Sequence, residues 1–202
     1  MEYLTVKGCA RAEYEIQHSV FIAQIKGVES YEEGLGFVKS VSKEYSDATH
    51  NCYAINCLDG QKFSDDGEPQ GTAGQPIMQA VKKKELNNVA LVVTRYFGGI
   101  KLGANGLVTS YTKSAVDAID SANIVVVKES YVGKVNIEYG AFRKVNELIG
   151  KSGKVLNTSF DEGAEIEFAV PIGKEAELNK SIAEITAGKS TPDYTGIQFV
   201  KY

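Results

Sequence analysis

A short apolar run followed by a glycine-rich bend constrains the fold of this chain more than any other stretch. Residues 89–94 (VALVVT) are apolar and mostly β-branched, which predicts a buried strand. Four glycines then fall within nine positions, at Gly98, Gly99, Gly103 and Gly106. From Leu107 onward, apolar residues recur at helical spacing. A strand, a glycine-rich loop and a helix in this order direct free backbone N–H groups toward an anion.

Two positive charges belong to this bend, since Arg95 precedes the glycines and Lys101 lies among them. The loop is not a Walker sequence, because Ala104 and Asn105 stand where Lys and Ser or Thr are required, and it is not G-x-G-x-x-G. Two interpretations stay open: an anion-binding loop, or glycines that only permit positive φ in a tight turn. The candidate anion or nucleic-acid contacts are Arg95, Tyr96, Gly98, Gly99, Lys101 and Gly103.

A second loop of small residues meets a helix start further upstream. Gly71, Thr72, Ala73 and Gly74 precede Pro76, a residue that suits the first turn of a helix running through residue 84. Two such loops in one domain favour a shared concave site. We therefore add Gly71, Thr72 and Gly74 to the candidate anion contacts.

An acidic segment lies within the polar loop predicted for residues 62–76. Asp65, Asp66 and Glu68 place three carboxylates in four positions, a set that suits either a hard divalent cation or turn chemistry with solvated charges. Together with His50 they define an alternative function, a metal-assisted hydrolase or phosphoesterase. His50, at the entrance of the strand predicted for residues 51–58, equally fits a structural role.

Composition limits the function classes. The 43% hydrophobic and 24% charged content is that of a globular protein. The net charge of −4 excludes a strongly basic body, so nucleic-acid contacts require a local patch. No run approaches the roughly 20 apolar residues of a membrane span, and no apolar signal segment begins the sequence. We therefore expect a cytoplasmic protein without membrane contact.

The three cysteines, Cys9, Cys52 and Cys57, form no disulfide framework. Cys52 and Cys57 lie five positions apart in a predicted strand and therefore face opposite sides of the sheet. We interpret them as small core residues and expect neither a bound metal nor another cofactor.

A polar break at residues 128–130, after a strand predicted for residues 124–127, divides the chain into domains 1–130 and 131–202. In the second domain the hydrophobic pattern gives the order βαββαβ, which is ferredoxin-like, with a hairpin around residues 161–163. The fold class is α+β. This second domain contains no carboxylate–histidine set, which favours a docking or RNA-facing module.

Three motifs in order resemble those of the IMPACT family, in its bacterial, YigZ-like branch, and the resemblance covers essentially the whole chain. The motifs are ATHNCYA at residues 48–54, DDGEP at 65–69 with GTAG at 71–74, and TRYFGGIKLG at 94–103.

The resemblance implies a ribosomal protein S5 domain 2-like fold for residues 1–130. It implies a ferredoxin-like second domain resembling domain V of the translocation elongation factor. The eukaryotic relatives dampen the amino-acid-starvation kinase, and with it a stress response, by competing for the activator of this kinase at the ribosome. Gln75 and Thr109 stand where basic residues are frequent in the family, and Asn105 replaces a common glycine. Each lost basic residue removes one phosphate contact.

These observations lead us to expect a non-enzymatic, translation-associated regulator that binds RNA or the ribosome. Arg95 and Lys101 would contact phosphate, and Tyr96 would stack on a base. The alternative partner is a protein of translation control, whose basic surface would bind the acidic loop of this chain.

Overall fold

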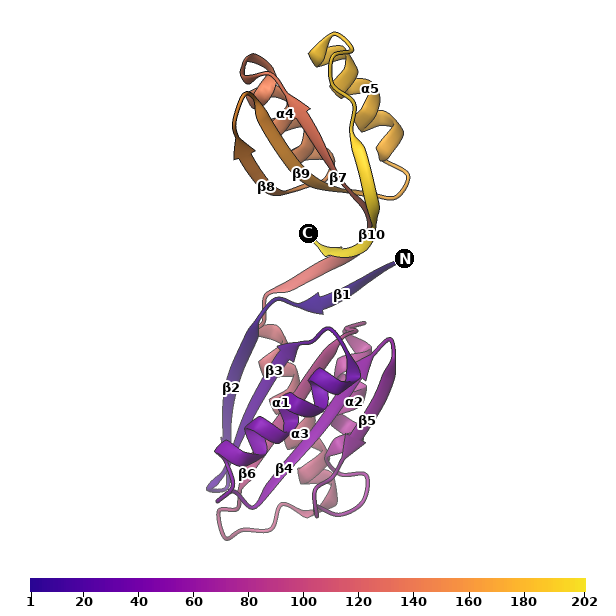
Figure 1. The fold of residues 1–202 in the computed structure, drawn as a ribbon. Helices are drawn as coiled ribbons and strands as arrows, with labels where there is room; N and C mark the ends of the chain where they lie inside the picture. Colours follow the sequence, from indigo (N-terminus) through magenta and orange to yellow (C-terminus); the bar gives the residue numbers. More distant parts are fainter. The chain divides into compact units, whose positions relative to one another are not determined.

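The computed structural model describes every residue from Met1 to Tyr202 (Figure 1). The chain divides into two compact units. The N-terminal unit comprises Tyr3–Val125, and the C-terminal unit comprises Val126–Tyr202 together with Met1–Glu2. The elements follow in the order β1 (Glu2–Val6), β2 (Cys9–Ile16), β3 (Ser19–Gly27), α1 (Tyr31–Glu44), β4 (His50–Cys57), β5 (Gly60–Ser64), α2 (Gly74–Lys83), β6 (Val89–Tyr96), α3 (Gly103–Asp120), β7 (Ile124–Ile137), α4 (Tyr139–Ser152), β8 (Lys154–Phe160), β9 (Ala164–Pro171), α5 (Glu175–Thr186) and β10 (Asp193–Lys201).

The N-terminal unit is built on one five-stranded antiparallel sheet in the order β2-β3-β6-β4-β5. The apolar run predicted as a strand becomes β6, which lies at the centre of this sheet and is buried along nearly its whole length. The register places Arg95 of β6 directly opposite His50 of β4 and Phe21 of β3. Two segments that are distant in sequence therefore become the immediate neighbours of Arg95.

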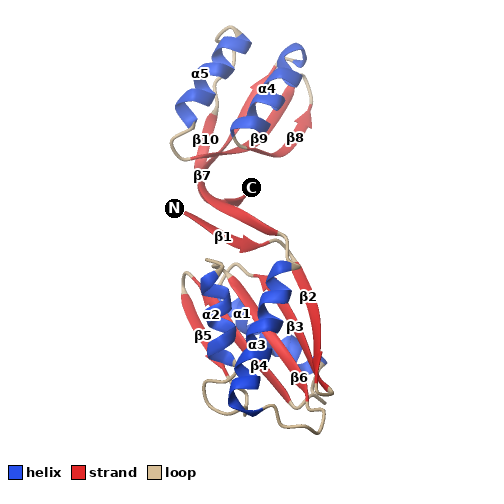
Figure 2. Cartoon of the chain, turned by 180° about the vertical axis from the view of Figure 1, so that it is seen from behind, coloured by secondary structure: helices blue, strands red, loops and turns tan.

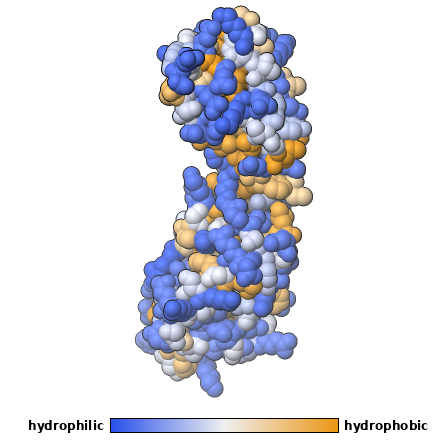
Figure 3. All heavy atoms as spheres, viewed as in Figure 1, coloured by the Kyte–Doolittle hydropathy of each residue, from blue (hydrophilic) through white to orange (hydrophobic).

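Helices cover both faces of this sheet, α2 and α3 on one face and α1 on the other (Figure 2). Each face has its own apolar core. Cys52 belongs to the core under α2 and α3, and Cys57 belongs to the core under α1, which confirms that the two thiols face opposite sides. The outer surface on the α1 side is mostly hydrophilic (Figure 3).

Ser30 caps the start of α1, a role that a serine followed three residues later by a glutamate indicates in a sequence. The Glu33 N–H donates to Ser30 Oγ over 3.2 Å, and the Glu33 carboxylate accepts from the Glu29 N–H over 2.7 Å. The Glu33 side chain thus closes the entry to the helix one residue earlier than a capping box does.

The structure shortens the polar loop predicted for residues 62–76 at both ends, since α2 already begins at Gly74. Gly60–Ser64 pair with β4 as the edge strand β5, so the loop before α2 covers only residues 65–73. The side chains of this strand are largely exposed, and Phe63 is 49% exposed. A strand held mainly by its backbone ladder leaves little hydrophobic pattern in the sequence, which explains the error.

The C-terminal unit contains the predicted βαββαβ order, with strands arranged β10-β7-β9-β8. α4 and α5 cover one face of this sheet around an apolar core that includes Val145, Phe168 and Ile182. On the helix-free face, Lys134 Nζ lies 2.8 Å from a Glu167 oxygen and 3.3 Å from a Glu165 oxygen. The α+β class, with an S5 domain 2-like first part and a ferredoxin-like second part, is confirmed.

The strand predicted to end at residue 127, before the polar residues 128–130, does not end there. β7 is one continuous strand, and each of its residues from Val127 to Lys134 pairs with β10, whose register shifts once between Tyr194 and Gly196. Polar side chains do not end a strand whose backbone groups are paired on a neighbour, so the break in hydrophobicity did not mark a break in structure. None of the five helices has the length and apolarity that crossing a bilayer requires.

Candidate functional site

A concave site of about 420 Å³ lies in the N-terminal unit, where β4 begins, β6 ends and α3 starts. Its volume falls within the range of roughly 300–1,000 Å³ that accommodates small ligands. Most of its wall is apolar. The apolar lining residues are Pro69, Phe97, Leu102, Ala104 and Leu107, and the ionisable ones are His50, Glu68, Arg95 and Lys101.

A buried ion pair forms the inner end of this pocket. Arg95 Nη1 donates to Glu68 Oε1 over 2.6 Å, and the two side chains are only 6% and 4% exposed. The guanidinium carbon lies 5.5 Å from the ring centroids of both Phe21 and Phe97. The Nε–H of Arg95 is buried and has no acceptor within the chain. Because Glu68 balances its charge, Arg95 does not act as the freely available phosphate contact expected from the sequence.

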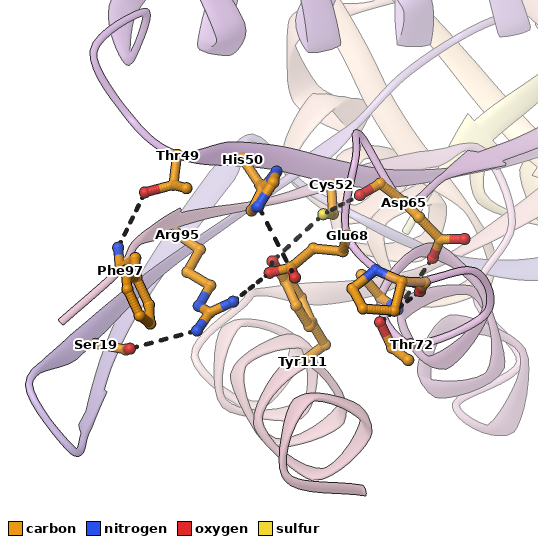
Figure 4. A network of polar contacts seen from close by, with 12 residues as sticks. Ser19, Thr49, His50, Cys52, Asp65, Glu68, Thr72, Arg95, Phe97 and Tyr111 are labelled. Carbon is orange, nitrogen blue, oxygen red and sulfur yellow. Dashed lines mark hydrogen bonds and ion pairs between the residues drawn. The ribbon is translucent and has the colours of Figure 1, made fainter. Parts of the chain in front are cut away.

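The Glu68 carboxylate continues into a buried chain of polar groups (Figure 4). Tyr111, which is fully buried in α3, donates its hydroxyl to Glu68 Oε1 over 2.8 Å. The Cys52 thiol lies 3.4 Å from that hydroxyl oxygen and 3.0 Å from the Asp65 carbonyl oxygen. Burial raises the pKa of both the Cys52 thiol and the Tyr111 hydroxyl. Both groups therefore stay protonated and serve as donors in a fixed scaffold.

His50 is the first residue of β4, and backbone contacts fix its ring. Its Nδ1 lies 2.7 Å from the carbonyl oxygen of Asp66. A carbonyl oxygen only accepts, so Nδ1 carries the hydrogen and Nε2 of the neutral ring is an acceptor. Nε2 lies 3.9 Å from Glu68 Oε2 on the wall of the pocket.

Two carboxylates of the acidic loop accept hydrogen bonds from backbone N–H groups. The Asp65 carboxylate accepts from the N–H groups of Gly71, Ala73 and Gly74 over 2.8, 3.0 and 2.8 Å. Partial burial opposes ionisation of Asp65, but these three hydrogen bonds together hold its pKa below the usual value. Asp66 accepts from the Asn51 N–H over 2.6 Å.

These contacts correct two expectations. The start of α2 already holds a carboxylate of the chain itself, so Gly71 and Gly74 offer their N–H groups to Asp65 and not to an outside anion. The three carboxylates are directed to different partners, and no group of His, Cys, Asp and Glu side chains in the chain is arranged to hold a metal ion. The alternative hydrolytic site built on Asp65, Asp66 and Glu68 therefore loses its geometric basis.

The glycine loop after β6 is anchored at its first two residues. The Phe97 N–H donates to Thr49 Oγ1 over 3.0 Å, and the Gly98 N–H donates to Ser19 Oγ over 3.2 Å. A Cβ on Gly98 would lie 2.0 Å from the carbonyl carbon of His18, which requires glycine at this position.

Beyond this anchor the loop faces solvent. Gly99 and Gly103 have φ values of +86° and +72°, with no neighbour within 4 Å of the position that a Cβ would occupy. Lys101, between them, is exposed and forms no ion pair. It is the one cation of the pocket whose charge the chain does not neutralise.

The start of α3 differs from the start of α2. No side chain caps its first turn, which contains no acidic residue. Its first N–H groups are therefore left without a side-chain acceptor at the positive end of an 18-residue helix. Gly103 and Ala104 of this turn line the pocket beside Lys101.

Comparison with known proteins is consistent with the motifs. Residues 17–119 match the Impact N-terminal domain, and residues 135–189 match a domain of unknown function, DUF1949. The IMPACT family member YvyE of Bacillus subtilis is 36% identical over 192 residues, which cover 93% of this chain and 88% of that protein. The chain belongs to the IMPACT family.

Other comparisons extend along the same length. The IMPACT family member YigZ of Escherichia coli is 32% identical over 180 residues, covering 86% of this chain and 88% of that protein. A crystal structure described as that of a hypothetical protein superposes with a TM-score of 0.63 at 29% identity, covering 95% of this chain and 96% of the other. Both units therefore have a counterpart in IMPACT relatives.

The motifs that carry the IMPACT resemblance contribute only some of their residues to the pocket. His50, Glu68, Arg95, Lys101 and Gly103 meet at the pocket. Thr72 is buried and donates to the Pro69 carbonyl oxygen over 2.6 Å, so its hydroxyl stabilises the loop.

Tyr96 is placed differently from the expectation that it joins Arg95. Side chains alternate along β6, so Tyr96 faces the opposite side of the sheet, where its hydroxyl donates to Asp47 over 2.8 Å. Phe97 provides the aromatic wall of the pocket instead. The period of two along a strand was the signal that could have identified Phe97, whereas nothing local pointed to Tyr111 or Ser19.

Proposed function

We propose that this IMPACT-family chain acts in translation control by binding RNA, free or within the ribosome, through the pocket of its N-terminal unit. The observation that carries the proposal is the combination of an aromatic wall at Phe97, the unpaired cation Lys101 and the uncapped start of α3 around one cavity. An aromatic ring suits a base, and a cation beside free N–H groups suits a phosphate. The family resemblance supports the connection with translation.

The charge of the pocket supports this assignment. Arg95 and Glu68 cancel each other, which leaves Lys101 as the net charge. The start of α3 adds the equivalent of about half a positive charge. The pocket therefore attracts an anion, although the whole chain carries a net charge of −4.

The C-terminal unit offers a poorer phosphate surface. On its helix-free face, both Glu165 and Glu167 lie within ion-pair distance of the single cation Lys134. Two carboxylates beside one ammonium leave a negative balance that repels a nucleic-acid backbone. We therefore assign RNA contact to the N-terminal unit.

Binding of a fluorescein-labelled single-stranded RNA, measured by anisotropy over a salt series, tests this proposal. We expect Lys101→Ala to weaken binding and to reduce the slope of log affinity against log salt by about 0.7, the value for one lost phosphate contact on a single strand. Lys83→Ala is the matched control, since Lys83 is an exposed lysine of the same unit that lies outside the pocket. An equal effect of the two variants, or no binding at all, would refute the assignment.

The aromatic wall has its own variant. Phe97→Leu keeps an apolar side chain at a residue that is 46% exposed, but it removes the ring on which a base would stack. We expect a loss of about 1–3 kcal/mol in RNA binding, the range for one stacked base, without a change in the salt slope. If ribosome co-sedimentation of the native chain survives nuclease treatment of the particles, the partner is a protein, which contradicts the proposal.

A further inference from the structure

We infer that the pocket selects a base with an exocyclic amino group, which donates one hydrogen to His50 Nε2 and the other to Glu68 Oε2. This inference rests on the proposed function and specifies which nucleotides the pocket accepts. It depends on two acceptor atoms, His50 Nε2 and Glu68 Oε2, that receive no hydrogen bond from the chain itself.

The first acceptor is His50 Nε2. The Asp66 carbonyl oxygen, 2.7 Å from Nδ1, holds the hydrogen of the neutral ring on that nitrogen. Nε2 therefore presents a lone pair. Glu68 Oε2, 3.9 Å from it, is also an acceptor and lies beyond hydrogen-bond distance.

The second acceptor is that Glu68 oxygen. The donors that reach this carboxylate, Arg95 Nη1 and the Tyr111 hydroxyl, both bind the other oxygen, Oε1, over 2.6 and 2.8 Å. Oε2 lines the pocket with no donor from the chain. Because the Glu68 side chain is only 4% exposed, this oxygen has little access to bulk water, and a ligand that donates to it gains free energy.

The separation of the two acceptors defines the group that fits between them. A nitrogen about 2.9 Å from both atoms would point each N–H within roughly 20° of its acceptor and keep the N–H···acceptor angle at about 150°, because the acceptors lie 3.9 Å apart. The group must carry two hydrogens. A hydroxyl or a ring N–H satisfies one acceptor and leaves the other unpaired, and a carbonyl oxygen is repelled by both.

Among the groups of RNA, only the exocyclic amines of adenine, cytosine and guanine meet this requirement. Uracil and hypoxanthine carry a carbonyl oxygen where cytosine and adenine carry an amine. A site that provides buried acceptors rejects a ligand without the matching donor more strongly than an apolar pocket does. The pocket therefore discriminates between bases through one group and not through their size.

Titration of the ¹⁵N-labelled full chain with AMP and with IMP, followed by NMR at mildly alkaline pH, tests this inference. We expect AMP to shift His50 Nε2 and to bind about tenfold or more tightly than IMP, with CMP and UMP as a second pair of the same contrast. His50→Phe keeps a ring of similar size without the acceptor. In this variant the affinity for AMP is expected to fall to that for IMP.

The outcomes separate the two proposals. Equal binding of AMP and IMP, with resonances of Lys101 and Phe97 shifted by both, overturns the amine selectivity and leaves the RNA-binding proposal standing. If none of the four nucleotides shifts a pocket resonance, both proposals fail. Preserved AMP selectivity in a folded His50→Phe variant also overturns the inference, because the selectivity then has another source.

Discussion

Replacing Tyr111 by Phe removes one hydroxyl from the interior of the N-terminal unit and leaves the rest of its packing in place. The ring of Tyr111 meets Phe21 edge to face, with centroids 5.2 Å apart, and this contact persists in Tyr111→Phe. What is lost is the hydrogen bond of 2.8 Å from the hydroxyl to the Glu68 carboxylate, together with the weaker contact of 3.4 Å from the Cys52 thiol, which keeps the Asp65 carbonyl oxygen as an acceptor. A buried hydrogen bond to a charged acceptor contributes about 1.5–3 kcal/mol, so we expect the free energy of unfolding to fall by about 2 kcal/mol.

Urea denaturation followed by far-UV circular dichroism measures this loss. With a slope of about 2 kcal/mol per molar urea, the midpoint of the N-terminal transition is expected to fall by about 1 M. Hydrogen exchange at the buried β6 amides assigns the transition to this unit. Tyr53→Phe is the matched control, since the Tyr53 hydroxyl has no hydrogen-bond partner in the chain, and we expect a change of less than about 0.5 kcal/mol.

A double-mutant cycle decides whether the loss comes from the Glu68 contact. In a Glu68→Gln background the acceptor is neutral, so Tyr111→Phe is expected to cost about 1 kcal/mol less than in the native chain. Purely additive effects of the two substitutions, or a loss from Tyr111→Phe no larger than that from Tyr53→Phe, would show that the buried chain of polar groups does not stabilise this unit as described.

Two further predictions concern the loops. Asp65→Ala removes three backbone hydrogen bonds at the start of α2 and is expected to destabilise the N-terminal unit by about 2 kcal/mol at neutral pH. Because folding lowers the pKa of Asp65, its contribution is complete above the unfolded value of about 3.9 and is lost as the pH falls through the folded pKa. The melting temperatures of the two chains should therefore converge in acid, and a constant difference would contradict this mechanism. Gly98→Ala forces its Cβ against the backbone of His18, so we expect a lower melting temperature and weaker RNA binding; a variant with native values in both would refute the anchoring role of the Ser19 contact.

Much of the fold could be predicted because local patterns dominate it. The apolar run of β6, the alternation in the C-terminal hairpin and the capping residue Ser30 are all read within a window of a few residues. β5 and the continuous β7 escaped prediction because backbone pairing with a neighbouring strand holds exposed or polar residues in them. Hydrophobic periodicity does not report such pairing.

The site was predictable only in part, for a related reason. The residues were found, but their partners depend on contacts across the fold. Arg95 and Lys101 have the same charge and lie six positions apart, yet only Arg95 meets a buried carboxylate. Nothing near Arg95 in the sequence indicates Glu68, because the register of β4 and β6 and the path of the acidic loop bring them together.

The Asp65 carboxylate at the start of α2 acts as a tethered competitor of any free anion. A group attached by a short chain has an effective concentration on the order of millimolar or higher, so a dilute ligand does not displace it. Of two helix starts that both follow loops of small residues, only the start of α3 receives no carboxylate from the chain itself. Asp65→Ala would therefore do more than destabilise the loop, because it would also make the N–H groups at the start of α2 available as a second anion-binding site, outside the pocket.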